Sequence, residues 1–228
     1  MIDIEQYLLG LTEQLKKQFG SRLVYVGLQG SYSRGEATEN SDLDVMTVID
    51  GLTPADLTAY RAVLQSAEHY DKSCGFICSR EDLLGWNPLE ICHLIHTTKD
   101  YFGVLNGLVP AFSRQDVRNF VKISINNLYH AICHRWIHAG ADRSAKALPD
   151  AYKGTFFILQ NLYYLTDGKF VATKAELLKV LDGKNRAVLE RAAELSKGKV
   201  YDFEESFELL FTWCQETLKA LNRETEQA

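Results

Sequence analysis

The spacing of apolar residues divides the first half of the chain into helices and strands. Over residues 3–19, apolar side chains recur every three or four positions, which predicts an amphipathic helix that ends at Gly20. Thr53-Pro54 combines an N-cap residue with a proline at the first helical position and predicts a second helix that runs to about residue 69. Short, largely apolar runs between turn residues predict three strands, at residues 22–28, 42–49 and 74–78.

After about residue 112 only helical spacing remains. It predicts five helices, which span about 117–136, 151–165, 174–181, 185–196 and 203–221. We place the change of character around Val109-Pro110 and Ser113. The sequence therefore predicts two domains, an α/β domain at residues 1–112 and an all-α helical bundle at residues 113–228, and hence an α+β fold.

Composition excludes several classes of protein. The 228 residues are 46% hydrophobic and 11% aromatic, which is more apolar surface than a disordered chain carries. The five cysteines are odd in number and none is spaced as CxxC, so reduced thiols are expected. The N-terminus lacks the apolar core of a signal peptide, and no apolar run reaches the roughly 18 residues of a membrane span. We therefore expect a cytoplasmic protein without a membrane partner.

The net charge bears on the choice of partner. Proteins that bind the phosphate backbone of long nucleic acids usually carry a basic excess. This chain has a formal net charge of −5, which disfavours long nucleic acid as a partner. Oligomeric state stays open, with a homodimer as one alternative.

The candidate chemistry is concentrated in residues 30–45, which read GSYSRGEATENSDLDV. Gly30-Ser31 follows a predicted strand, and backbone amides and a hydroxyl at such a turn can hold a phosphate, with Arg34 about one helical turn further on. Asp42 and Asp44 are two residues apart on the next predicted strand, so both side chains face the same way. Two carboxylates on one face suit Mg²⁺, which accepts substrate phosphates as further ligands. The segment therefore predicts phosphoryl or nucleotidyl transfer.

This segment resembles the signature of the polymerase-β nucleotidyltransferase superfamily, in which Gly-Ser is followed after about ten residues by Asp-x-Asp at the start of a strand. The matching residues are Gly30, Ser31, Asp42 and Asp44, and the longer form of the motif adds Arg34, Gly35 and Ser41. The order of the domains is also similar to that of the small-molecule (aminoglycoside and lincosamide) nucleotidyltransferases, in which a small α/β domain with a mixed sheet precedes a helical domain.

The resemblance implies an Mg²⁺-dependent enzyme that transfers a nucleoside monophosphate from a nucleoside triphosphate, commonly ATP, to a hydroxyl of a small molecule, such as an aminoglycoside or lincosamide antibiotic. It implies that Asp42 and Asp44 are catalytic and bind the metal. It also implies that the nucleotide is bound by Gly30, Ser31, Arg34 and Ser41.

The chain departs from the family in one respect. A third acid usually stands on a later strand, whereas residues 74–78 carry none. Asp71 is the candidate for a further metal ligand and Glu90 for a further catalytic acid, and the alternative for each is a solvated surface carboxylate. Related helical domains often place a lysine near the triphosphate, which makes Lys153 and Lys174 candidate nucleotide ligands. The alternative for Lys174 is an exposed lysine in the first turn of a helix.

A second cluster lies in the predicted helical half. His130, His134 and His138 recur every four residues, with Cys133 nearby. Two histidines at this spacing can chelate zinc, but an HExxH frame is absent, and an exposed histidine stripe is the alternative.

Two other functions stay open. An enzyme of the same superfamily that modifies a protein or a tRNA end is one, and a basic groove would favour it. A non-catalytic nucleotide-binding or toxin–antitoxin-type interaction module of the same fold is the other, and the lack of a third acid favours it.

Overall fold

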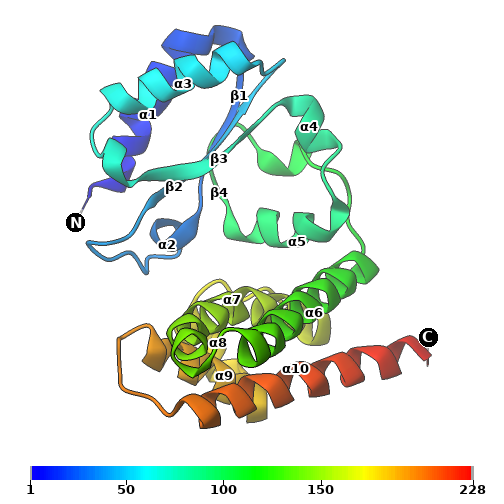
Figure 1. The fold of residues 1–228 in the computed structure, drawn as a ribbon. Coiled ribbons are helices and arrows are strands. Elements are labelled where there is room, and N and C mark those ends of the chain that lie inside the picture. The colour runs from blue at the N-terminus through cyan, green and yellow to red at the C-terminus, as the bar shows by residue number, and fades with distance from the viewer. Residues whose placement is uncertain (1, 227–228) are drawn as a thin grey trace. The chain divides into compact units, whose positions relative to one another are not determined.

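The computed structural model describes residues 2–226, with side chains as far as residue 223. It divides the chain into two compact units, Met1–Phe112 and Ser113–Ala228, and Figure 1 shows the helices and strands of each. The division lies where the hydrophobic pattern changes from mixed to purely helical.

The first unit is a mixed sheet with helices, as the resemblance implies, and it has four strands where the sequence predicts three. Its strands lie in the order β3-β2-β1-β4, with β2 parallel to β3 and the other two pairs antiparallel. Its elements are α1 (Ile4–Phe19), β1 (Leu23–Leu28), α2 (Gly30–Ser33), β2 (Leu43–Ile49), α3 (Pro54–Ser66), β3 (Ser73–Cys78), α4 (Arg80–Leu84), α5 (Pro88–Thr97) and β4 (Lys99–Phe102).

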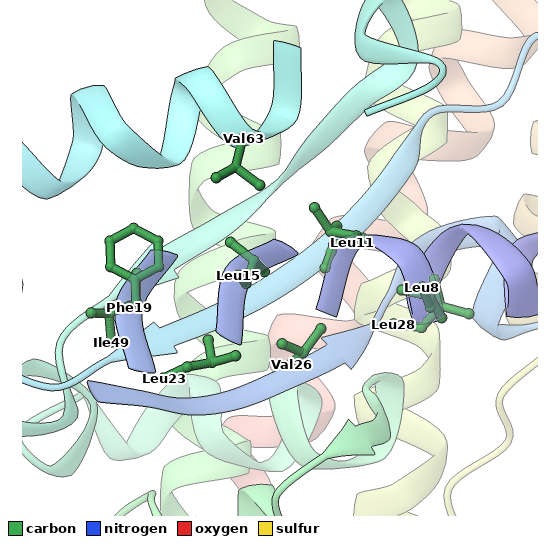
Figure 2. Close-up of a cluster of buried hydrophobic side chains, with 10 residues drawn as sticks. Leu8, Leu11, Leu15, Phe19, Leu23, Val26, Leu28, Ile49 and Val63 are labelled. Atoms are coloured by element: carbon green, nitrogen blue, oxygen red, sulfur yellow. The ribbon is translucent and has the colours of Figure 1, made fainter. Parts of the chain in front are cut away.

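One apolar layer holds α1 and α3 against the sheet. Leu8, Leu11 and Leu15 recur along one face of α1 and are at most 1% exposed. They pack with Val26 of β1 and Val63 of α3, as Figure 2 shows. Complete burial of one such side chain stabilises a fold by about 1.5–3 kcal/mol. The helix predicted over residues 3–19 thus forms because its apolar face has a sheet to cover.

A second cluster covers the opposite face of the sheet. It includes Tyr25 and Met46, which are fully buried. The buried hydroxyl of Tyr25 donates a hydrogen bond of 2.7 Å to Oδ1 of Asp100 in β4. Burial and this carboxylate raise the pKa of Tyr25 far above its ordinary value. Asp100 is therefore the hydrogen-bond partner of a core phenol.

Strand β4 and helix α5 were missed by the hydrophobic pattern. Lys99 and Asp100 are exposed, so β4 lacks the apolar face that marks a half-buried strand. It forms because it pairs with β1 at the edge of the sheet. From the sequence alone, Asn87-Pro88 is expected to interrupt a helical turn at residues 80–86. In the structure it begins α5 instead, with Asn87 as the N-cap and Pro88 as the first residue.

The second unit is all helical. Its helices are α6 (Arg114–His138), α7 (Ala141–Asp167), α8 (Lys174–Val180), α9 (Gly183–Leu195) and α10 (Phe203–Glu226). Tyr152 and Trp213 are among its largest fully buried side chains, and the Tyr152 hydroxyl donates to the carbonyl of Ser206 at 2.7 Å. Within residues 2–226, no helix is both long and apolar enough to cross a bilayer.

Helix α7 is longer than predicted, because Pro149 lies inside it. Proline has no N–H to donate to the carbonyl four residues earlier, which is that of Ala145. The hydroxyl of Tyr201 donates to this carbonyl instead. A side chain from outside the helix thus replaces the missing bond, and the helix continues through the proline.

The close approach of β2 and β3 depends on Gly75. Its φ is +142°, and a Cβ there would lie 2.1 Å from the carbonyl oxygen of Val45. We expect Gly75→Ala to lower the free energy of unfolding by about 1–3 kcal/mol, because backbone atoms must move. Urea denaturation followed by circular dichroism measures the change.

Gly10→Ala is the matched control for that variant. Gly10 lies within α1, and a Cβ there would meet no atom within 4 Å. Alanine should stabilise the helix by about 0.5–1 kcal/mol. Equal stabilities of the two variants would show that β2 and β3 do not need the glycine.

Candidate active site

The turn after β1 is held from two sides. The backbone N–H of Gln29 donates to the carbonyl of Asp44 in β2 at 2.8 Å. The side-chain amide of Gln29 donates to the hydroxyl of Thr98, which precedes β4, at 2.9 Å. The Ser33 hydroxyl closes the turn with a bond of 3.1 Å to the carbonyl of Gly30. The Gly30-Ser31 backbone is therefore fixed relative to both β2 and β4.

Gly30 lies against the carboxylate of Asp44. Its φ is +67°, a value that side chains rarely allow, and a Cβ would lie 1.9 Å from Oδ2 of Asp44. The absence of a side chain at this position is what lets the turn and the carboxylate approach each other. Gly30, Ser31 and Asp44 are thus brought together, as the motif predicts.

Asp42 and Asp44 stand at the start of β2. Asp44 is the second residue of the strand and is half-buried, whereas Asp42 precedes the strand and is exposed. Their spacing of two places both carboxylates on one face. Carboxylate oxygens are the ligands that Mg²⁺ prefers, and a pair leaves room for phosphate oxygens. The donor set at this edge of the sheet therefore fits magnesium.

The loop from α2 to β2 carries the other predicted nucleotide ligands. Arg34 is 12% exposed and donates from Nε to Oε2 of Glu36 at 3.0 Å. The Ser41 hydroxyl accepts a bond of 2.9 Å from the N–H of Thr38, and the ammonium of Lys72 donates to the carbonyl of Glu39. Arg34 and Ser41 thus lie on a loop that is bonded within itself and to the start of β3; their role in nucleotide binding stays a prediction.

His93 is a neighbour of the site that the motif does not contain. It lies on α5, where burial, the positive charge of Arg34 and His96 lower its pKa to about 4. His93 is therefore neutral at pH 7 and adds no second charge beside Arg34. On sequence alone, His93 and His96 are candidates for lining the cleft near the active domain, but the sequence does not show that His93 lies beside Arg34.

The neighbouring strand presents a thiol to the carboxylate pair. In the parallel pairing of β2 and β3, Cys74 lies opposite Asp44. Partial desolvation of the thiol is the largest cause that raises the pKa of Cys74, and the negative charges of Asp44 and Asp42 raise it further. The thiol therefore stays protonated at neutral pH, and no acid of β3 faces the pair.

Asp71 and Glu90 do not form a cluster with the carboxylates of Asp42 and Asp44. Asp71 is exposed in the turn Tyr70–Lys72 before β3. Glu90 lies in the first turn of α5, and its Oε2 accepts a bond of 2.6 Å from the indole N–H of Trp86, which precedes the helix. Among the side chains of residues 2–223, no group of three or more histidine, cysteine, aspartate or glutamate residues is close enough to hold a metal ion. The metal role of Asp71 and the catalytic role of Glu90 stay predictions without a geometric basis.

The two lysines that are candidate nucleotide ligands line the same cavity in the second unit. Lys153 of α7 and Lys174 of α8 both line a cavity of about 290 Å³. The ammonium of Lys174 lies 5.5 Å from the ring centre of Phe156. Two cations and an aromatic wall suit an anionic ligand with an apolar part, and nucleotide binding by these lysines stays a prediction.

Gly30→Ala tests the contact with Asp44. The new methyl group would displace a movable carboxylate, so we expect folding to survive while binding of Mg²⁺-ATP weakens by at least about tenfold. Gly35→Ala is the control, because Gly35 has nearly the same φ, +68°, but a Cβ there would meet nothing within 4 Å. Isothermal titration calorimetry on both variants separates backbone strain from displacement of Asp44; equal losses would contradict the contact.

The lowered pKa of His93 makes stability depend on pH. The unfolded state takes up a proton near pH 6.5 and the folded state only near pH 4, so the stabilisation is complete above pH 6.5 and is lost as the pH falls toward 4. The loss over this window should be about 2–3 kcal/mol. His93→Gln should show a flatter pH profile in urea denaturation between pH 4.5 and 7.5; parallel profiles for the two proteins would disprove this.

Comparison with known proteins supports the interpretation of the motif. Residues 10–99 match the family model of the nucleotidyltransferase domain, and this range contains the turn, the carboxylate pair and Cys74. No curated protein sequence matches the chain closely enough to count as a relative. Over the whole fold, the chain is similar to the crystal structure of spectinomycin adenyltransferase AAD(9) from Enterococcus faecialis with ATP and spectinomycin. That likeness has a TM-score of 0.58 at 16% identity and covers 94% of this chain and 99% of that chain.

The structural likeness concerns the fold, whereas the family match concerns the domain that contains the motif. At 16% identity the structural likeness shows the fold, which is an α+β unit followed by a helical unit. The family match concerns the segment that carries the chemistry. Residues 10–99 therefore form a nucleotidyltransferase domain.

Proposed function

We propose that the chain transfers a nucleoside monophosphate, with ATP as the donor, to a hydroxyl of a small antibiotic-like molecule, and that it uses Mg²⁺. The observation that carries the proposal is the contact of the Gly30 turn with the Asp44 carboxylate, beside Asp42. A phosphate turn and a pair of metal-binding carboxylates at one edge of a sheet are what transfer from a nucleoside triphosphate requires.

The residues have separate tasks in this reaction. The backbone of Gly30 and the Ser31 hydroxyl hold the triphosphate, and the guanidinium of Arg34 adds positive charge. Asp42 and Asp44 would hold Mg²⁺, which supplies neutralisation of the phosphate charge when bound. The acceptor hydroxyl oxygen forms a bond to the α-phosphorus, the bond to the pyrophosphate oxygen breaks, and the hydroxyl proton is released.

The nature of the two substrates is supported by the similar fold. The spectinomycin adenyltransferase was crystallised with ATP and spectinomycin. A similar two-unit chain is suited to ATP and to an aminoglycoside, aminocyclitol or lincosamide acceptor. We extend the proposal to Lys153 and Lys174 as ligands of the triphosphate, because both line one cavity and no acid other than Asp150 lines it.

Cys74 favours a second candidate function. A thiol that stays protonated is a poor proton acceptor for the attacking hydroxyl. With Cys74 opposite Asp44, the site can bind a nucleotide yet transfer it slowly or not at all. The second candidate is therefore a nucleotide-binding module that has lost transfer.

Asp42→Asn tests the proposed reaction. Pyrophosphate release is measured with Mg²⁺, each of the four nucleoside triphosphates, and a panel of aminoglycosides, aminocyclitols and lincosamides. We expect release that requires an acceptor and that falls by at least about 10³-fold in Asp42→Asn. Asp42 is exposed, so the variant should fold; retained activity would disprove the role of the pair.

Three further variants refine that outcome. Asp71→Asn and Glu90→Gln should keep most of the activity if these acids are surface carboxylates, and a loss in either would assign it a role. Cys74→Asp adds an acid opposite Asp44 on an exposed strand position. A wild-type protein that binds ATP without transfer, together with an active Cys74→Asp variant, would establish the second candidate.

A further inference from the structure

The histidine stripe of α6 is not used by the proposed reaction. His130, His134 and His138 are all exposed on the last two and a half turns of the helix. Their ring centres are 6.0 Å apart for His130 and His134, and 4.8 Å apart for His134 and His138. Among the described side chains, these imidazoles contact one another and take part in no hydrogen bond or ion pair. Their nitrogens are therefore open to a ligand.

We infer that His134 and His138 form a chelating pair for a divalent transition-metal cation of the Zn²⁺ or Cu²⁺ type. In an imidazole bound to zinc at about 2.0–2.1 Å, the ring centre lies about 3.2 Å from the ion, so two rings on one tetrahedral ion have centres about 5 Å apart. The ring centres of His134 and His138, 4.8 Å apart, are close to that separation. Those of His130 and His134 are 6.0 Å apart and depart from it further, which makes that pair the weaker of the two.

The position on the helix favours a cation. His138 is the last residue of α6, and His134 lies one turn before it. The carbonyl groups of a final helical turn carry partial negative charge, which attracts a cation. The pair thus lies at the end of α6 where the helix carbonyls attract a bound cation most strongly. The connection through Gly140 to α7 lies next to it.

Cys133 does not belong to the site. It is half-buried. Burial raises the pKa of the Cys214 thiol in α10 to about 12, and the nearby Cys133 adds to that rise. Trp136 stacks on Phe207 of α10 at 4.1 Å between ring centres. Both residues therefore face α10, while the histidines lie on the exposed side. The ligands are two imidazoles, and water would complete the coordination.

Imidazole ligands determine which metals bind. They suit Zn²⁺, Ni²⁺ and Cu²⁺, whereas Mg²⁺ prefers oxygen. The Irving–Williams order predicts tighter binding of Cu²⁺ than of Zn²⁺. The site is therefore chemically distinct from the Asp42 and Asp44 pair, and the two can be titrated separately.

Calorimetric titration with Zn²⁺ and then with Cu²⁺ tests the inference. The untagged full chain is used at pH 7.5 with excess Mg²⁺, which keeps the carboxylate pair occupied. We expect one ion per chain, bound more tightly as Cu²⁺, and at least about tenfold weaker binding in His134→Gln. At the same concentration, the ion should raise the melting temperature of the wild type by more than that of His134→Gln.

Three variants distinguish the ligands. His138→Gln should weaken binding nearly as much as His134→Gln, whereas His130→Gln and Cys133→Ser should change it by no more than about twofold. Equal affinity of the wild type and His134→Gln would overturn the inference, as would absence of binding by the wild type. Loss of metal affinity in Cys133→Ser alone would overturn it and identify the thiol as the ligand. Loss of metal affinity in His130→Gln but not in His138→Gln would overturn the choice of His134 and His138 as the pair.

Discussion

The approach of the Gly30 backbone to the Asp44 carboxylate is the constraint on which the site depends. Only a residue without Cβ fits there, because a side chain would occupy the position of Oδ2. The N–H of Gln29 and the carbonyl of Asp44 then fix the separation of the turn from β2 at a hydrogen-bond distance of 2.8 Å. The candidate phosphate-binding backbone at Gly30 and the candidate metal-binding carboxylate of Asp44 are thus positioned by the turn after β1 and by the second residue of β2.

The rest of the first unit keeps this contact rigid. The apolar face of α1 covers β1 and β2 from one side, and the cluster around Tyr25 and Met46 fills the other. Burial on both faces opposes sliding of the strands, because a shift of one residue would move Val45 and Ile49 out of the first cluster and Met46 and Val48 out of the second.

Hydrophobic spacing and one motif were enough to predict much of this molecule. Helix α1 and strands β1, β2 and β3 follow from local spacing, and Gly30, Asp42 and Asp44 follow from the motif. Strand β4 could not be predicted, because Lys99 and Asp100 are exposed and the strand exists only through its pairing with β1. Helix α7 was predicted too short, since the bond from Tyr201 that lets it continue through Pro149 comes from a residue far along the chain. For the same reason the sequence does not show that Cys74 lies opposite Asp44, which is a matter of strand register.

The bond between Gln29 and Thr98 has a consequence for the order in which the molecule assembles. The two residues are 69 positions apart, and Thr98 lies at the entry to β4. Closing a loop of that length lowers the conformational entropy of the chain, and this cost opposes formation of the bond. During synthesis, β1 and β2 can pair while α5 and β4 are still being made. We therefore expect the turn at Gly30-Ser31 to be the last part of the first unit to become ordered, once β4 has joined the edge of the sheet.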